Sequence, residues 1–174
     1  EDLRSPCTEE IAVFQAFSRV IREAGRKFVV MDTAPTGHTL LLLDATGAYH
    51  RDIVRQMGST GVHFTTPMMQ LQDPKQTKVL LVTLAETTPV LEAANLQADL
   101  RRAGIEPWAW IINNSVAAAC VTSPLLRQRA RNERSEIEAV ATRHARRYAV
   151  VPLLEEEPVG VDRLEQLVMN GVAA

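Results

Sequence analysis

The residues with the clearest chemical potential lie in the loop Asp32–Leu40, which reads Asp-Thr-Ala-Pro-Thr-Gly-His-Thr-Leu. The loop follows a short apolar run, Phe28–Met31, which predicts a buried strand. A strand that ends in an aspartate and a Pro/Gly/Thr loop presents a carboxylate at the carboxyl edge of a parallel sheet, where ligands bind in such folds. Asp32 is therefore a candidate ligand for Mg²⁺, a hard cation that prefers oxygen ligands and keeps much of its water. The alternative is an aspartate that caps a turn and holds no ligand.

Two further residues of this loop carry chemistry. Gly37 allows the backbone to approach a phosphate closely or to adopt a positive φ. His38 adds a titratable ring that can bind a metal. The simpler interpretation of His38 is a loop histidine that hydrogen-bonds a backbone carbonyl.

A third candidate is Cys7, which follows Ser5 and Pro6 in a pattern typical of a helix start. A cysteine in the first turn of a helix lies where free N–H groups and the helix dipole favour the thiolate form. The commoner role of a lone cysteine is that of a small buried residue. Glycine at position 25 predicts the end of this helix.

The elements that must position these residues alternate along the chain. Besides residues 28–31, apolar runs predict strands, and periodic segments predict helices that separate them. This alternation predicts an α/β fold with a mostly parallel sheet flanked by helices. The segment Ser59–Thr77 is expected to be irregular. The predicted strands are Val79–Leu84, Trp108–Ile112 and Tyr148–Val151, and the predicted helices are Thr87–Ala103, Leu125–Arg147 and Gly160–Met169.

Length and composition limit the function classes. The 174 residues, 46% hydrophobic and 23% charged, predict a single domain over residues 1–174 with a real core. A net charge of −2 gives no reason to expect a nucleic acid or an anionic membrane as partner. No apolar run approaches the roughly 20 residues that span a bilayer, and the start is not that of a signal peptide. Two cysteines, Cys7 and Cys120, far apart in sequence, favour a reduced, cytoplasmic chain.

The sequence contains no G-x-x-x-x-G-K-[ST] motif, whose glycines and lysine cradle phosphates in many nucleotide-binding proteins. It also begins at Glu1 rather than at a methionine. We therefore expect a fragment that follows such a phosphate-binding loop and the first strands of its sheet.

The string DTAPTGHTLLLLDA resembles the signature loop of the arsenical pump-driving (arsenite-translocating) ATPases. The resemblance covers nearly the whole chain, through SPCTEE upstream and FTTPMM, ETTPVLEAANLQADL, WIINNS and VPLLEEEPVG downstream. It is strongest with the second of the two homologous halves of the bacterial pump ATPases. The resemblance implies a P-loop NTPase of the deviant Walker A class, here truncated to the C-terminal portion of one ATPase half.

The resemblance also implies roles for individual residues. Asp32 would bind Mg²⁺, directly or through a water, beside the γ-phosphate of ATP. Cys7 and His38, with Ser5 as a weaker candidate, would bind As(III) or Sb(III), soft centres that favour thiolate. Asn113 would hydrogen-bond the adenine edge, because an amide donates and accepts at once. The loop that begins at Pro152 and Leu153 would flank the adenine; without the resemblance, these are turn residues.

The activity implied by the family is ATP hydrolysis stimulated by As(III) or Sb(III), coupled to extrusion of arsenite or antimonite through a membrane carrier. The implied partners are this carrier, the N-terminal half of the same polypeptide and a metallochaperone, but no nucleic acid. The implied location is the cytoplasm, at the inner face of the plasma membrane. The isolated chain is expected to be inactive, because it lacks the amides and lysine that stabilise charge during phosphoryl transfer.

Two other functions remain open. A targeting ATPase for tail-anchored membrane proteins belongs to the same superfamily, but this sequence has no CxxC and its segment Gly58–Pro74 is short for a client groove. A non-enzymatic interaction domain agrees with the missing phosphate loop but leaves Asp32, His38 and Asn113 unexplained. The arginine-rich helix predicted at Leu125–Arg147 is interpreted as a solvated face, with a partner-docking face as the alternative.

Overall fold

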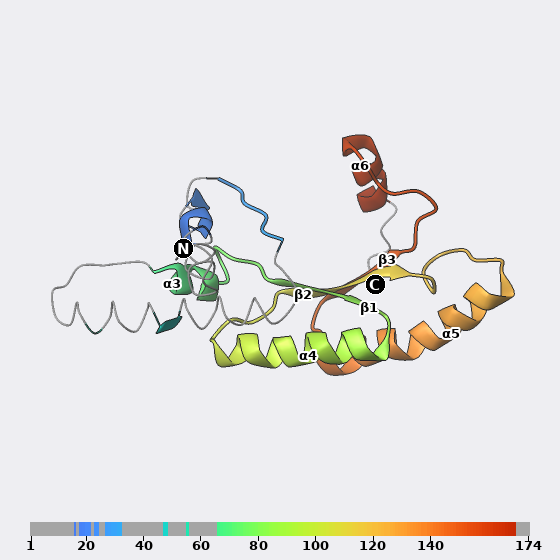
Figure 1. Ribbon diagram of the computed structural model, residues 1–174, viewed down its shortest axis with the longest axis horizontal. Coiled ribbons are helices and arrows are strands. Elements are labelled where there is room, and N and C mark those ends of the chain that lie inside the picture. The colour runs from blue at the N-terminus through green and yellow to red at the C-terminus, as the bar shows by residue number, and fades with distance from the viewer. Residues whose placement is uncertain are drawn as a thin grey trace, which may run out of the picture. The chain divides into compact units, whose positions relative to one another are not determined.

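The computed structural model describes residues 16, 18–21, 23–24, 27–32, 47–48, 55 and 66–169 (Figure 1). The chain divides into two compact units, a first unit of Glu1–Lys78 with Asp99–Glu106 and a second unit of Val79–Ala98 with Pro107–Ala174. The expectation of a single domain stays a prediction. The described elements are α3 (Pro67–Gln72), β1 (Leu80–Leu84), α4 (Thr87–Arg102), β2 (Ala109–Ser115), α5 (Pro124–Ala139), the π-helical turn η2 (Val140–His144), β3 (Tyr148–Pro152) and α6 (Val161–Met169).

The second unit is built on a parallel sheet of three strands in the order β1-β2-β3. In the register of the sheet, Val82 of β1 lies beside Ile111 of β2, which lies beside Ala149 of β3. Helices separate successive strands, as parallel pairing requires. The predicted fold class, an α/β protein with a mostly parallel sheet flanked by helices, is confirmed.

The core lies between the sheet and its helices. Strand residues on one face are buried, with Leu81 at 3%, Trp110 at 1% and Ile112 at 0% exposure. Figure 1 shows α4 and α5 running along one side of the sheet. Trp110 stacks on His144 with ring centroids 5.5 Å apart, and the backbone carbonyl of His144 accepts a hydrogen bond of 3.1 Å from Gln97 of α4. The chain segment after α5 is thereby fixed against both the sheet and α4.

Helix α4 ends at Arg102, one residue earlier than the helix predicted for residues 87–103 and two residues before Gly104. Gly104 has a φ of +77°, a conformation that glycine adopts without a steric penalty. The amide of Ile105 reaches back to the carbonyl of Leu100 at 2.9 Å, which satisfies one of the last helical carbonyls. In the same unit, Gln72 Nε2 donates to the carbonyl of Ala103 at 2.8 Å, so α3 is tied to the end of α4.

The predicted strand at Phe28–Met31 is wrong. Residues 28–32 have no regular secondary structure, and the side chains of Phe28 and Val30 are 94% and 80% exposed. A strand exists only where a neighbouring strand satisfies its amides and carbonyls, and the pairings among the described residues all involve β1, β2 and β3. The apolar pattern was therefore not sufficient to form a strand here.

Smaller differences concern element boundaries. The segment expected to be irregular contains α3, which begins after Thr66; its hydroxyl accepts a 3.2 Å hydrogen bond from the amide of Met69 and thereby caps the helix. The long charged helix ends at His144 because Ala145 adopts an extended conformation after the π-helical turn. Residues 16, 18–21 and 23 are helical, and Ile21 is buried, in agreement with the predicted first helix.

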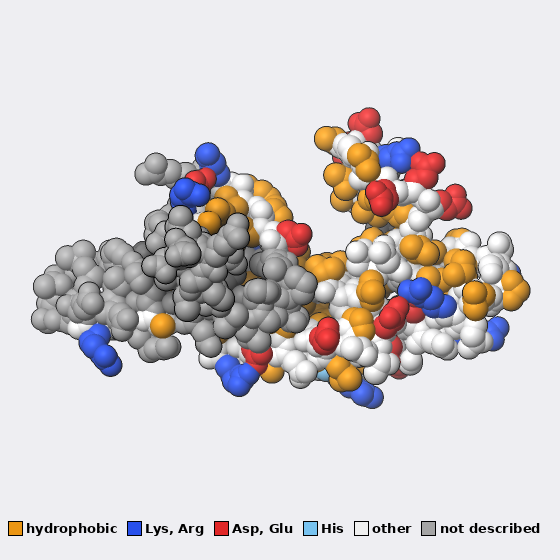
Figure 2. Space-filling model, viewed as in Figure 1, with side chains coloured by type: hydrophobic (Ala, Val, Ile, Leu, Met, Phe, Trp, Pro, Cys, Tyr) orange, Lys and Arg blue, Asp and Glu red, His pale blue; other side chains and the backbone are white. Residues whose placement is uncertain are grey.

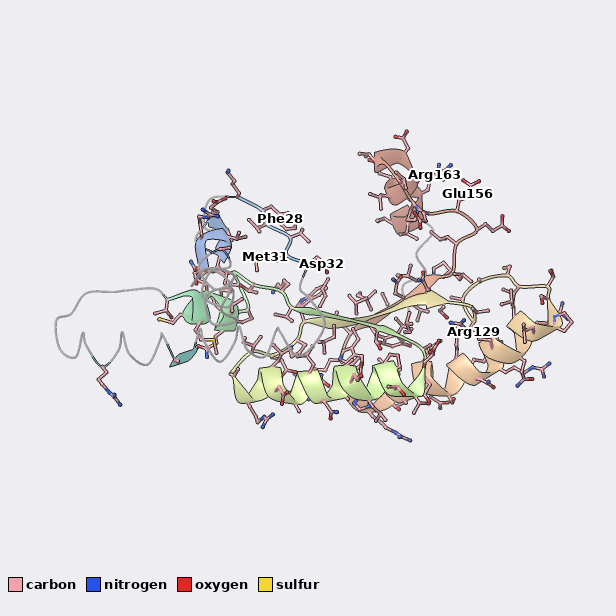
Figure 3. The ribbon with its side chains drawn as sticks, in the orientation of Figure 1. Phe28, Met31, Asp32, Arg129, Glu156 and Arg163 are labelled. Carbon is pink, nitrogen blue, oxygen red and sulfur yellow. The ribbon has the colours of Figure 1, made fainter. Side chains whose placement is uncertain are left out.

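Helix α6 differs from α4 and α5 because none of its described side chains is buried. Val161 and Val168 are 70% and 77% exposed, and Figure 2 shows apolar and acidic side chains together on this helix. Arg163 forms an ion pair of 2.7 Å with Glu156, which lies in the acidic turn before the helix (Figure 3). Both partners of this pair are more than half exposed, so it contributes little to stability.

Candidate functional site

The best-defined candidate site lies at the carboxyl edge of the sheet in the second unit. Because the strands are parallel, the residues that end β2 and those that follow β3 lie at the same edge. Ser115 of β2 pairs with Pro152 of β3, and the amide of Leu153 donates to the carbonyl of Ser115 at 2.9 Å. The structure thus brings the segment with Asn113 next to Pro152 and Leu153, the residues to which the family resemblance gives a role at the adenine; that role stays a prediction.

Asn113 occupies β2 rather than the turn after it, because the strand extends to Ser115, beyond the predicted end at Ile112. Its position in the register is beside Leu84, and its side chain is partly exposed. Among the residues that the structure describes, its side-chain amide makes no hydrogen bond. A free, accessible amide at a sheet edge can donate to and accept from one planar ligand edge, which fits a nucleotide base.

The backbone changes conformation at the residue that follows Asn113. Asn114 is exposed and has a φ of +52°, in the left-handed region that asparagine adopts more readily than most residues. The pairing of β2 with β3 is irregular between Ile112 and Ser115, at the same place. The carboxyl end of β2 therefore departs from regular strand geometry before the chain enters the following loop.

The buried carboxylate of Glu133 supports this irregular end of β2. Glu133 of α5 is 3% exposed and accepts hydrogen bonds from Ser115 Oγ at 3.0 Å, from the amide of Ala117 at 2.9 Å and from Arg129 Nε at 3.1 Å. Sequence reasoning missed this residue, because Arg129 and Glu133 have the i, i+4 spacing of an ordinary surface ion pair. The missed signal was that a buried carboxylate needs several donors, and Ser115 and its neighbours could supply them.

The same arginine connects α5 to the residues after β1. Arg129 Nη2 lies 3.1 Å from Glu86 Oε1, and Thr87 donates its hydroxyl hydrogen to Glu136 Oε1 at 2.8 Å. These residues line an open hollow of about 520 Å³, and Figure 3 shows Arg129 extending from α5. Both side chains of the Arg129–Glu86 ion pair are about half exposed, so the pair orients the arginine more than it stabilises the fold.

The predicted magnesium ligand, Asp32, lies in the first unit, whereas Asn113 lies in the second. Its side chain is exposed, and its carboxylate is the oxygen donor type that Mg²⁺ prefers (Figure 3). The described part of the chain contains no group of three His, Cys, Asp or Glu residues that could hold a metal ion. Cys7, His38 and Ser5, the predicted metalloid ligands, lie outside the described residues.

The other cysteine and the arginines of α5 are also described. Cys120 is a free, exposed thiol in the segment between β2 and α5. Arg127, Arg131 and Arg134 are exposed, as expected for a solvated helix face. None of the helices within the described residues is both long and apolar enough to cross a membrane.

Comparisons with known proteins give this site a family context. The family model described as anion-transporting ATPase matches residues 1–57 and 42–170. An arsenical pump-driving ATPase of Acidiphilium multivorum and one of Escherichia coli are each 75% identical over 96% of this chain. A putative arsenical pump-driving ATPase of Halobacterium salinarum is 31% identical over 95% of the chain.

The chain spans 28% of the length of the Acidiphilium and Escherichia relatives and 27% of the Halobacterium relative. The matched residues nevertheless include the signature loop, the strands of the sheet and both loops at its carboxyl edge. The predicted P-loop NTPase fold class agrees with this match. Since the family model covers nearly every residue, the chain belongs to the anion-transporting ATPase family.

Proposed function

We propose that this chain supplies the base-binding loops and the magnesium carboxylate of a nucleotide site in an arsenical pump-driving ATPase. The observation that carries the proposal is the pairing of two loops at one sheet edge, where the amide of Leu153 binds the carbonyl of Ser115 two residues after Asn113. Relatives that are 75% identical are named arsenical pump-driving ATPases, which supports this assignment.

In this proposal, each residue has a separate task. The amide of Asn113 donates to and accepts from the adenine edge, while the loop at Pro152 and Leu153 lies along the base. The carboxylate of Asp32 orients Mg²⁺, which supplies positive charge beside the transferring phosphoryl group. The phosphate-cradling amides and lysine come from polypeptide outside these 174 residues, so the isolated chain has negligible ATPase activity.

The proposed metalloid site includes His38, which lies near the end of the signature loop opposite to Asp32, and two residues upstream of the loop. We propose that Cys7 and His38, with Ser5 as a weaker ligand, bind As(III) or Sb(III) together with ligands from the other ATPase half. Thiolate and imidazole are suitable donors for such soft centres. Because the loop Asp32–His38 joins the magnesium carboxylate to a metalloid ligand, metalloid binding would change the geometry of the nucleotide site. The hydrolysis would then drive a membrane carrier that extrudes the oxyanion, with the ATPase held at the inner face of the plasma membrane.

The base contact is the part of this proposal that the geometry makes most directly testable. Replacing Asn113 with alanine in the complete gene product should weaken ATP binding about tenfold, the equivalent of roughly 1.4 kcal/mol from lost hydrogen bonds. Isothermal titration calorimetry with ATP measures this change. Asn132→Ala, which removes an exposed amide from α5, is the matched control and should leave the affinity unchanged. An Asn113→Ala protein that binds ATP as tightly as wild type would refute the base contact.

A further inference from the structure

The side chain of Glu133 is the one polar group that α5 buries; Ala130 is the other buried residue of that helix. Removing a carboxylate from water costs several kcal/mol unless donors compensate it. Glu133 has three such donors, from Ser115, Ala117 and Arg129, at 2.9–3.1 Å. A carboxylate is suited to this place because its two oxygens can accept a hydroxyl, a backbone amide and a guanidinium at once.

Ser115 connects this carboxylate to both base-binding loops. Its side chain is fully buried, its hydroxyl donates to Glu133 and also accepts from the amide of Ala118 at 3.3 Å, and its carbonyl accepts from the amide of Leu153. Asn113 lies two residues before Ser115 in the same strand. One side chain of α5 therefore fixes the residue that joins the Asn113 segment to the Leu153 segment.

The backbone between Asn113 and Ser115 needs such a support. Asn114 has a positive φ, and the strand register shifts between Ile112 and Ser115, so the regular ladder does not determine this stretch. The hydrogen bonds of Glu133 to Ser115 and Ala117 lie directly after this irregular stretch. They hold its end in place where the sheet alone does not.

We propose that Glu133 is a positioning residue for the nucleotide base: through Ser115 it sets the separation between Asn113 and the loop at Leu153. This inference rests on the proposed function, because it needs the adenine to bind between these two loops. Glu133 itself does not touch the nucleotide. Its loss should therefore weaken recognition of the base and leave recognition of the phosphates intact.

The test uses the complete gene product, photolabelling with 2-azido-ATP and mass-spectrometric mapping of the label to peptides within residues 107–160. Glu133→Gln keeps the shape of the side chain but replaces one acceptor oxygen with a donor. We expect about tenfold weaker protection of this label by ATP, while protection by inorganic tripolyphosphate, which has no base, stays within about twofold of wild type. Glu138→Gln, the same change at an exposed position of α5, is the matched control and should change neither value.

A second variant keeps the test valid if Glu133→Gln does not fold. Ser115→Ala removes the hydroxyl that links Glu133 to both loops and should produce the same selective loss for ATP. Because both residues act through one contact, the double variant should be no weaker than either single variant. Additive losses in the double variant would contradict a shared path through Ser115.

The outcomes separate the inference from the function on which it rests. If wild-type protein carries no label within residues 107–160, the proposed base site itself is wrong. If the wild type is labelled and Glu133→Gln retains its ATP protection, the positioning role is overturned. An equal loss for ATP and tripolyphosphate would also overturn it, because Glu133 would then only stabilise the fold.

Discussion

Strand β1 and the segment Phe28–Met31 are similar in composition and opposite in structure. Both are short apolar runs followed by acidic and turn-forming residues. In β1, Leu81 is 3% exposed and the strand pairs with β2 along its whole length. In the other segment, Phe28 is 94% exposed and the residues belong to no strand. Composition makes a segment able to form a strand, but a neighbouring backbone decides whether it does.

The comparison extends to the polar residues that follow each segment. Asn113 and Ser115 lie at the carboxyl end of β2, a strand that is paired on both sides, and Ser115 is held there by hydrogen bonds to Glu133 and Leu153. Asp32 follows a segment without a ladder, and its side chain is exposed. A candidate ligand is held in a defined geometry only where the element that carries it is itself paired.

The largest expected effect is on the free energy of unfolding, from two matched side-chain truncations, one in the paired sheet and one in Phe28–Met31. Ile112→Ala in β2 removes a fully buried side chain and should lower the free energy of unfolding by about 3 kcal/mol through lost burial and a cavity. Val30→Ala removes an 80% exposed side chain and should change it by no more than about 0.5 kcal/mol. Urea denaturation of the 174-residue chain measures both. A cost of 2 kcal/mol or more for Val30→Ala would show that Phe28–Met31 packs against a neighbour in solution.

Sequence reasoning predicted the parts of the fold that depend on local signals. The three paired strands, the helices between them and the stop of α4 at Gly104 follow from apolar runs, helical periodicity and a glycine in the left-handed region. The strand at residues 28–31 could not be judged in this way, since its existence depends on a distant partner. The extension of β2 through Ser115 depends likewise on its pairing with Pro152.

For the candidate site, sequence and resemblance brought out Asn113, Pro152 and Leu153, which the structure places at one sheet edge. They did not reveal Glu133, because its spacing from Arg129 looks the same whether the pair is exposed or buried. Only packing distinguishes the two cases: Glu133 is 3% exposed, whereas the side chain of Arg129 is 49% exposed. The supporting residues of a site are for this reason harder to predict than the residues that face the ligand.

Gly104 in the first unit and Gly160 in the second unit both have a positive φ but differ in their surroundings. A Cβ on Gly104 would lie 3.0 Å from Gln72 Nε2, and the backbone there has a φ of +77°. Gly104→Ala should therefore cost about 2 kcal/mol, from the left-handed backbone and from displacing the hydrogen bond of Gln72 to Ala103. At Gly160 the φ is +88°, but no atom of the described part of the chain lies within 4 Å of an added Cβ, so Gly160→Ala should cost about 1 kcal/mol or less. Equal losses of unfolding free energy would show that the Gln72 contact contributes nothing.

The smallest expected effect concerns Asp73, which ends α3 in the first unit. Hydrogen bonds from the amide of Lys75 at 2.9 Å and from the side chain of Gln76 at 2.8 Å lower the pKa of the Asp73 carboxyl below its ordinary value. A carboxyl with a lowered pKa in the folded state stabilises that state fully above about pH 4. This stabilisation is lost as the pH falls through the folded pKa, because the folded and unfolded forms are then both protonated.

Asp73→Asn should therefore make the 174-residue chain slightly less stable than wild type at pH 7, and the difference should shrink steadily below pH 4. The side chain is only partly buried, so solvent screens the interaction and the difference at neutral pH will be small. Nuclear magnetic resonance titration of the Asp73 carboxyl carbon measures the pKa directly, with the variant as the assignment control. A midpoint at or above the ordinary aspartate value would mean that the turn after α3 is not formed in solution. The first unit would then lack local order even where its own side chains provide the hydrogen-bond partners, and the contrast with the paired sheet would be sharper than the structure indicates.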